Sequence, residues 1–339
     1  MTVFHGGNVW QGDRPGDWLD FSANLNPEGP PAWVLEAMGE GLSRARYYPD
    51  LQGAAARRGM AAHLNLPEEC VLVTSGGIEA AALASFMPGR RIIAQPTFQE
   101  YGRLREPNLD ISRDELHDYA FKRGDILWIC NPNNPTGDAL TRDEVIALLA
   151  RIEAAGGLLV VDEAFIEYCP EHSVADLAKD HDLVVLGSLT KVLAIPGIRL
   201  GYLATNPELM GWLSDGLLPW RLNCVADAVA AALPGHRDDF DAIRRLNDRR
   251  RAAFADDLRA LCADVHPSNA NFLLCDFGRD MRPAIEQLKE QRILVRPCGM
   301  FPGLTDGHIR LCVRTEAENA RLVEALRGRL CLPLRPPSA

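Results

Sequence analysis

Six short runs of apolar residues occur in the first two-thirds of the chain, and stretches with helical periodicity separate them. Each run has the length of a strand and contains no regular alternation with polar residues. Continuously apolar strands that alternate with helices are typical of a mostly parallel sheet whose two faces are both covered. The pattern therefore predicts an α/β fold with strands at residues 71–73, 91–94, 126–130, 157–161, 183–186 and 201–204.

The two ends of the chain follow other patterns. Residues 1–30 hold Gly, Pro and Asn with little periodicity, which predicts an extended arm laid over the body. A helix is expected from Pro30–Pro31 to Met38, because proline favours the first turn of a helix. We expect an arm at residues 1–30, a large domain at 31–235 and a smaller α/β domain at 236–339. The elements expected in the smaller domain are helices at 237–261, 283–291 and from 316 onward, and strands at 271–274, 294–296 and 309–313.

Composition and charge narrow the class of protein. The chain has 339 residues and a net charge of -10, so it lacks a positive field that would attract nucleic acid or an anionic membrane. No apolar run is long enough to span a bilayer. The N-terminus lacks the basic and apolar regions of a signal peptide. Nine cysteines are scattered without a Cys-x-x-Cys pair, which favours a reducing cytoplasm over a disulfide framework or a structural zinc site. We therefore expect a cytoplasmic protein without a metal ion and with no nucleic-acid or membrane partner.

One lysine differs from the others in its surroundings. The chain has four lysines, and Lys122, Lys179 and Lys289 sit among charged residues. In contrast, Lys191 follows the apolar run Leu183–Leu186 and a turn of small residues. A buried lysine amine is a strong nucleophile toward aldehydes once burial lowers its pKa. The competing interpretation is a lysine that extends from a strand end into solvent.

Residue types that hold a phosphate dianion surround this lysine. Ser188 and Thr190 offer hydroxyl groups, and Arg199 offers a planar guanidinium. The pair Gly76–Gly77 joins a predicted strand to a predicted helix, whose first N–H groups can approach an anion closely. An aldehyde that also carries a phosphate is pyridoxal 5'-phosphate, so we expect this cofactor.

Three further side chains lie just after predicted strands. Asp162 ends an apolar strand, where a carboxylate needs a cationic partner such as a protonated pyridine nitrogen. The competing interpretation is an aspartate that caps the next helix. Asn134 lies in the run 131–137, where two prolines and a glycine fix the backbone, so its amide can donate a hydrogen bond to the cofactor's ring oxygen. The competing interpretation of this run is a plain turn, because turns favour Asn, Pro and Gly. Phe98 can stack on the cofactor ring or pack in the core.

In this order and spacing, the motifs resemble the fold-type I pyridoxal phosphate enzymes, the aspartate aminotransferase superfamily. The matching motifs are Asn-Pro-x-Asn-Pro-Thr-Gly at 131–137, Asp-Glu-Ala-Phe at 162–165, Ser-Leu-Thr-Lys at 188–191 and Pro-Gly-x-Arg-x-Gly-Tyr at 196–202. The resemblance implies a large domain with a seven-stranded sheet, a smaller domain and a homodimer. It implies that Lys191 binds the cofactor covalently, that Asp162 contacts the pyridine nitrogen, that Asn134 contacts the ring oxygen and that Phe98 stacks on the ring. It also implies that the cofactor phosphate is bound by Gly76, Ser188, Thr190 and Arg199. Tyr48 is expected to reach the cofactor phosphate of a partner subunit. The run Ser75–Gly77 departs from the Gly-Asn-Gly-Glu that relatives often carry.

Within the superfamily, the chain resembles the threonine-phosphate decarboxylases of cobalamin biosynthesis most. Segments 4–8, 19–27 and 301–304 resemble the decarboxylases, and Phe165 stands where aminotransferases usually carry a tyrosine. The resemblance implies decarboxylation of L-threonine O-3-phosphate to (R)-1-amino-2-propanol O-2-phosphate. It implies that Arg310 binds the substrate carboxylate, that Arg296 and His5 bind its phosphate, and that Asn134 also contacts the substrate. The competing interpretation of Arg296 is a surface strand residue.

Two other functions remain open. One is an aminotransferase that acts on histidinol phosphate or another phosphorylated amine. The other is a pyridoxal phosphate-binding protein without turnover, such as the sensor domain of a regulator. The second is disfavoured because Lys191 and Asp162 are both present and no DNA-binding segment is visible.

Overall fold

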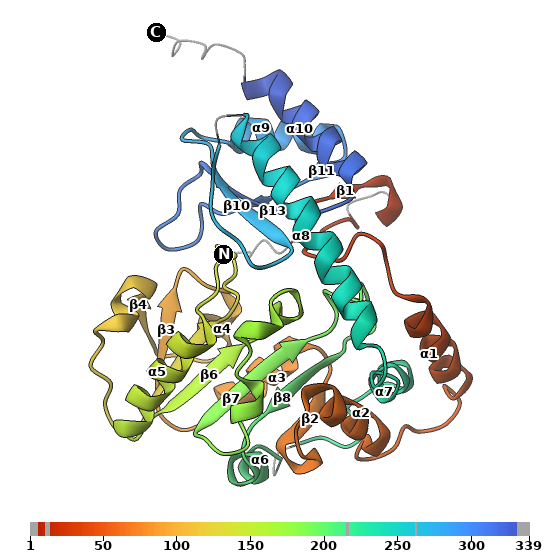
Figure 1. The fold of residues 1–339 in the computed structure, drawn as a ribbon, viewed down its shortest axis with the longest axis vertical. Coiled ribbons are helices and arrows are strands. Elements are labelled where there is room, and N and C mark those ends of the chain that lie inside the picture. Colours follow the sequence, from red (N-terminus) through yellow and green to blue (C-terminus); the bar gives the residue numbers. More distant parts are fainter. Residues whose placement is uncertain (1–5, 11–13, 215–216, 262, 331–339) are drawn as a thin grey trace.

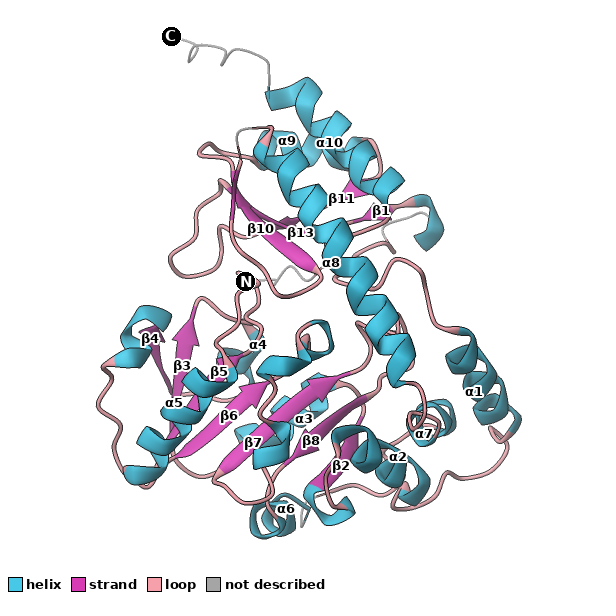
Figure 2. Cartoon of the chain, viewed as in Figure 1, coloured by secondary structure: helices cyan, strands magenta, loops and turns pink. Residues whose placement is uncertain are grey.

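A seven-stranded sheet forms the centre of the larger part of the molecule (Figures 1 and 2). The computed structural model describes residues 6–10, 14–214, 217–261 and 263–330. The strand order is β2-β8-β7-β6-β5-β3-β4, and β8 is the one strand of this sheet that runs opposite to the other six. The predicted, mostly parallel sheet is therefore confirmed. The strands are β2 (Val71–Thr74), β3 (Arg90–Gln95), β4 (Asn108–Ser112), β5 (Asp125–Cys130), β6 (Leu158–Asp162), β7 (Leu183–Ser188) and β8 (Gly201–Ala204).

Burial explains why the strand pattern was continuously apolar. Every residue of β5, β6, β7 and β8 is buried. Successive side chains point to opposite faces of a strand, so Leu127 and Ile129 pack into one core, while Trp128 packs into another. The first core includes side chains from α1 (Ala32–Ser43), α2 (Ala54–Leu64), α5 (Arg142–Ala154) and α7 (Cys224–Ala231). The second includes side chains from α3 (Gly77–Ser85), α4 (Glu100–Leu104) and α6 (Pro207–Ser214).

Two predictions about this part of the chain were wrong or incomplete. Helix α1 ends at Ser43 rather than Met38. Its glycines do not break it, because Gly41 packs against α7 so closely that a Cβ there would lie 2.6 Å from the Cys224 carbonyl oxygen. The edge strand β4 was missed because its residues are mostly exposed and show no apolar run.

A second, smaller sheet lies above the first in Figure 1. Its four strands are all antiparallel, in the order β12-β13-β10-β9. Three helices contribute side chains to its core, namely α8 (Arg237–Arg259), α9 (Arg282–Glu290) and α10 (Glu316–Leu330). Helix α8 contacts the large core through Phe240 and the small core through Phe254. The predicted α/β character of this region is present, while the domain boundaries themselves stay a prediction. The strands are β9 (Asp264–Val265), β10 (Phe272–Asp276), β12 (Arg296–Pro297) and β13 (His308–Cys312).

The N-terminal arm is integrated into this smaller region. Strand β1 (Leu19–Asp20) pairs in parallel with β11 (Ile293–Leu294), and the Phe21 side chain is buried in the small core. This pairing brings residues near position 20 close to β13. Among the described helices, none is long and apolar enough to cross a membrane.

Candidate active site

The candidate site lies where the parallel strands of the large sheet end. The arrowheads of β6 and β7 in Figure 2 point toward the part of the molecule that holds β10 and β13. Strand β6 ends at Asp162 and β7 ends at Ser188, three residues before Lys191. Open α/β sheets bind ligands at the carboxyl ends of their strands, so the fold places the predicted residues where a ligand can reach them.

Lys191 lies in the turn after β7 and is the one lysine of the four that is not exposed. Burial, aided by the positive charges of Arg199 and Arg310, lowers the pKa of its amine from 10.5 to about 8, while Asp162 opposes the shift. A substantial fraction of the amine is therefore neutral near physiological pH. This is the state that attacks an aldehyde.

Asp162 is buried and accepts two hydrogen bonds. The Tyr101 hydroxyl donates to Oδ2, and the Ala164 N–H donates to Oδ1 over 2.9 Å. Burial raises the pKa of the Asp162 carboxyl, while the hydrogen bonds from Tyr101 and Ala164 and the charge of Lys191 oppose that rise. A protonated ring nitrogen placed beside it would be the cationic partner that a buried carboxylate requires.

The predicted phosphate residues converge on one cradle. Gly76 has a φ of 79°, and a Cβ at this position would lie 2.4 Å from Arg199 Nη2. Gly77 packs against Ser188, because a Cβ at position 77 would lie 3.3 Å from Ser188 Cβ. The Ser188 and Thr190 hydroxyl groups share a hydrogen bond, with their oxygens 2.8 Å apart. Helix α3 begins at Gly77 with no side chain capping its first turn. The set has the cation, hydroxyls and helix N-terminus that a phosphate dianion requires.

Asn134 links the large sheet to the small one. Its Oδ1 accepts a hydrogen bond from Arg310 Nη1, and Arg310 Nη2 donates to the Ser22 carbonyl oxygen over 2.8 Å. The Asn134 loop is fixed from inside, because Asn133 Nδ2 donates to Thr136 Oγ1 at 2.7 Å and to the Pro96 carbonyl oxygen at 2.9 Å. Burial, aided by the charge of Arg296, lowers the pKa of Arg310 from 12.5 to about 10.

Arg296 stands directly opposite Arg310 in the β12–β13 pair. Both residues are buried, with exposed fractions of 4% and 7%, so the surface interpretation of Arg296 is wrong. Like charges directly opposite each other destabilise a sheet, and burial adds a desolvation cost. An anion bound between the two guanidinium groups would offset both costs.

The remaining predicted residues have less decisive positions. Phe98 is half-buried, and its ring meets the Tyr101 ring at 81° with centroids 5.4 Å apart. Tyr48 is 82% exposed, and its ring lies 5.0 Å from that of Trp220. His5 lies outside the described residues.

Two contributors to the site were missed in the sequence. Tyr101 was assigned no role, although a buried tyrosine hydroxyl usually finds a polar partner. Ser22 contributes its backbone carbonyl to Arg310, and no residue-type pattern announces such a contact. Ser22 also holds the arm, because its Oγ accepts from the Gly7 N–H over 2.9 Å and donates to Asp20 Oδ1.

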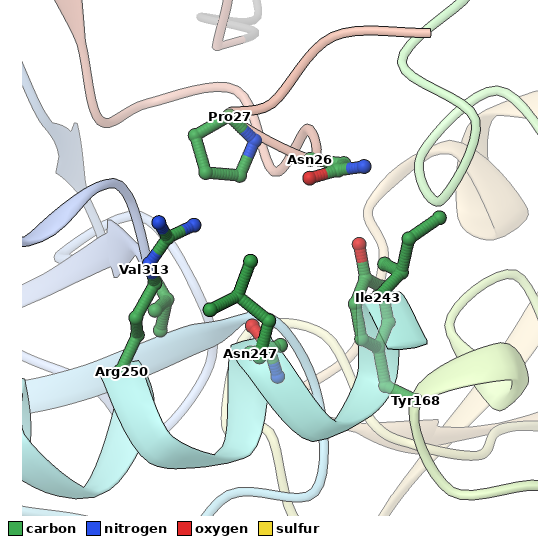
Figure 3. A pocket seen from close by; sticks show the side chains of 8 residues that line it. Asn26, Pro27, Tyr168, Ile243, Asn247, Arg250 and Val313 are labelled. Atoms are coloured by element: carbon green, nitrogen blue, oxygen red, sulfur yellow. The ribbon is translucent and has the colours of Figure 1, made fainter. Parts of the chain in front are cut away.

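A separate small cavity lies beside α8 (Figure 3). It is lined by Asn26, Pro27, Tyr168, Ile243, Leu246, Asn247, Arg250 and Val313. None of the predicted site residues lines it.

Comparison with known proteins identifies the family. The model of the aminotransferase class I and II family matches residues 16–326.

The chain belongs to this family. Its members are pyridoxal 5'-phosphate-dependent enzymes. The glycine cradle beside Arg199, the buried carboxylate of Asp162 and the low-pKa amine of Lys191 fit that cofactor.

Relatives with two different activities resemble the chain over nearly its whole length. Threonine-phosphate decarboxylase from Salmonella typhimurium is 33% identical, with 97% of this chain and 98% of the relative covered. Histidinol-phosphate aminotransferase from Symbiobacterium thermophilum is 30% identical, covering 93% and 91%. The crystal structure of L-threonine-O-3-phosphate decarboxylase from Porphyromonas gingivalis has a TM-score of 0.84 and 26% identity, covering 92% of this chain and 99% of that one.

Proposed function

We propose that this enzyme decarboxylates L-threonine O-3-phosphate to (R)-1-amino-2-propanol O-2-phosphate in cobalamin biosynthesis. The observation that carries the proposal is the buried pair of Arg296 and Arg310, directly opposite each other in β12 and β13. Threonine phosphate carries two anionic groups, a carboxylate and a phosphate, and two arginines can neutralise both. The 33% identity to a threonine-phosphate decarboxylase supports the same choice.

In this proposal the cofactor occupies the cradle described above. Lys191 would bind its aldehyde carbon, Asp162 would face the ring nitrogen, Asn134 would face the ring oxygen and Phe98 would cover the ring. The phosphate contacts come from Gly76, Gly77, Ser188, Thr190 and Arg199. When bound, the cofactor withdraws electrons from the α-carbon of the substrate.

The protein selects the reaction by orienting the substrate. With the cofactor bound, one direction at the substrate α-carbon, the reactive axis, would be the direction along which a bond can break, so a decarboxylase must hold the carboxylate on that axis. Arg310 binds the carboxylate from a fixed position, because Asn134 and the Ser22 carbonyl hold its two terminal nitrogens. Arg296, together with His5, anchors the phosphate and thereby sets the rotation of the substrate. Lys191 returns a proton to the α-carbon after carbon dioxide leaves.

The second candidate is a histidinol-phosphate aminotransferase. The 30% identity to such an enzyme favours it, although histidinol phosphate carries a phosphate and no carboxylate, so it would need only one arginine of the pair. Phe165 argues for the decarboxylase. Its ring packs edge-on against Phe272 at 5.0 Å, and a phenyl ring offers no hydroxyl for a bond to the cofactor's ring oxygen.

The proposal includes the assembly and location of the enzyme. We propose a homodimer in the cytoplasm, in which the exposed Tyr48 of each subunit reaches the cofactor phosphate of the other. Symmetric dimers are the commonest closed assemblies. The division into an arm (1–30), a large domain (31–235) and a small domain (236–339) belongs to the same proposal.

Two assays on the purified holoenzyme distinguish the candidates. We expect threonine phosphate to release carbon dioxide with no 2-oxoacid present, and histidinol phosphate with 2-oxoglutarate to give little glutamate. Stoichiometric glutamate from histidinol phosphate, without carbon dioxide from threonine phosphate, would instead establish an aminotransferase.

A further inference from the structure

Tyr101 occupies a position between the two groups that face the expected cofactor ring. It lies in α4 with no exposed surface, and its hydroxyl donates to Asp162 Oδ2. Its ring meets Phe98 edge-on at 5.4 Å and contacts Trp128 at the same centroid distance. One side chain therefore contacts both the carboxylate and the aromatic ring of the cofactor site.

No other side chain among the described residues donates a hydrogen bond to Asp162. The second bond comes from the Ala164 backbone N–H, and the neighbouring Cys130 thiol is directed to the Pro132 carbonyl oxygen over 3.1 Å. The nearby charged group is Lys191. Burial and the charge of Asp162 raise the pKa of Tyr101 well above 10, so its hydroxyl stays a donor.

The Tyr101 backbone is also fixed. The buried Arg91 donates to the Tyr101 carbonyl oxygen and to the Arg105 carbonyl oxygen, each over 2.6 Å. The Arg91 guanidinium also lies over the Trp128 ring, 4.9 Å from its centroid. With backbone and ring both held, the hydroxyl has little freedom to leave Asp162.

We propose that Tyr101 is a positioning residue that keeps the Asp162 carboxylate ionised and turned toward the ring nitrogen of the cofactor. A buried carboxylate without this bond loses a charge-assisted hydrogen bond and is more easily protonated. The inference rests on the cofactor site of the proposed function and is independent of which substrate the enzyme decarboxylates or transaminates.

The first test compares Tyr101→Phe with the wild-type holoenzyme. Phenylalanine keeps the ring contacts and removes only the hydroxyl. In the variant, the cofactor's ring nitrogen would be protonated less fully and would withdraw less electron density from the covalently attached Lys191 Nζ. Nζ would therefore keep its proton to higher pH. We expect the pH midpoint of the bound cofactor's visible absorption change to rise by about one unit, and cofactor release after dilution to become roughly tenfold faster.

Tyr168→Phe is the matched control. Tyr168 is another buried tyrosine, with 3% of its surface exposed, and it lines the separate cavity of Figure 3. Loss of its hydroxyl should leave the absorption midpoint and the release rate unchanged. If both variants shift these quantities equally, the effect is general loosening of the core and the proposal is wrong.

A double-mutant cycle tests whether Tyr101 acts through Asp162. In an Asp162→Asn background no carboxylate remains to be kept ionised, so adding Tyr101→Phe should change cofactor release less than about twofold. Equal effects of Tyr101→Phe in both backgrounds would overturn the proposal. If carbon dioxide assays fail while this cycle succeeds, the substrate assignment is wrong and the role of Tyr101 stands.

Discussion

The proposed cofactor wall and the proposed substrate wall of the candidate site are built in different ways. The cofactor wall, made of Asp162, Lys191 and the glycine cradle beside Arg199, follows the strand ends of one mostly parallel sheet. The substrate wall, made of Arg296, Arg310 and the Ser22 carbonyl, joins two antiparallel strands to the N-terminal arm. The first wall uses short local motifs, whereas the second depends on strand register and on contacts between distant segments. In the proposed function, the cofactor wall supplies chemistry common to the family and the substrate wall selects the reaction.

The largest effect should come from removing the nucleophile of the cofactor wall. Lys191→Ala should abolish turnover and the covalent link to the cofactor, because the other three lysines are exposed. Visible absorbance and borohydride reduction followed by mass spectrometry measure the link. Lys179→Ala, at an exposed lysine, is the control and should behave as wild type. A borohydride-reducible adduct on another lysine of the Lys191 variant would refute the assignment.

Removing the carboxylate should damage the cofactor wall nearly as much. Without Asp162, a protonated ring nitrogen loses its buried partner, which typically costs about 3–5 kcal/mol. We expect Asp162→Ala to fold and to lose two to three orders of magnitude in kcat, on the order of that cost. Circular dichroism checks folding, and Asp118→Ala, at a 91% exposed side chain, controls for loss of charge. A rate near that of wild type would exclude this role.

The contrast between the walls also explains what the sequence allowed us to predict. Lys191, Asp162 and Ser188 lie at or just after the ends of apolar strands, and Arg199 lies just before the next one. These strands were readable from hydrophobicity, so the gathering of the four residues at one edge of the sheet could be predicted from the sequence alone. The pairing of Arg296 with Arg310 could not, because it depends on the register of two strands separated by a loop.

The contacts that were missed have physical reasons. Ser22 acts through a backbone carbonyl, which every residue possesses, so its identity carries no signal. The strand β4 is exposed at the sheet edge and lacks the apolar pattern that marked its neighbours. Tyr101 was missed because a buried aromatic residue gives the same sequence pattern whether or not its hydroxyl has a functional partner.

A substitution in the substrate wall should separate phosphate binding from general catalysis. Losing a charge-assisted interaction in a buried site costs about 1.5–3 kcal/mol, so Arg296→Ala should lower kcat/KM for threonine phosphate by roughly 10- to 100-fold. The loss for unphosphorylated threonine should be much smaller. Arg259→Ala, at an exposed arginine of α8, should change neither value. Equal losses on both substrates would contradict a phosphate role for Arg296.

The smallest change to be measured is the activity recovered in hybrid dimers, which tests whether a partner subunit contributes Tyr48 to the cofactor wall. Tyr48→Ala and Lys191→Ala should each be inactive alone, yet a hybrid dimer would hold one site with both defects and one site with none. Random exchange at equal amounts should therefore restore about a quarter of wild-type activity. Native mass spectrometry verifies the exchange. Hybrids that form without regaining activity would mean that Tyr48 does not serve the other subunit.

The most direct test of the proposed reaction follows the α-hydrogen of the substrate. Threonine phosphate deuterated at the α-carbon is incubated with the holoenzyme in ordinary water without a 2-oxoacid, and the product is analysed by NMR. If the substrate wall places the carboxylate on the reactive axis, carbon dioxide leaves, the α-carbon–deuterium bond stays intact, and each 1-amino-2-propanol phosphate carries one deuterium at C1. Loss of the deuterium to water without release of carbon dioxide would show that the α-hydrogen occupies that axis, and would contradict a decarboxylase.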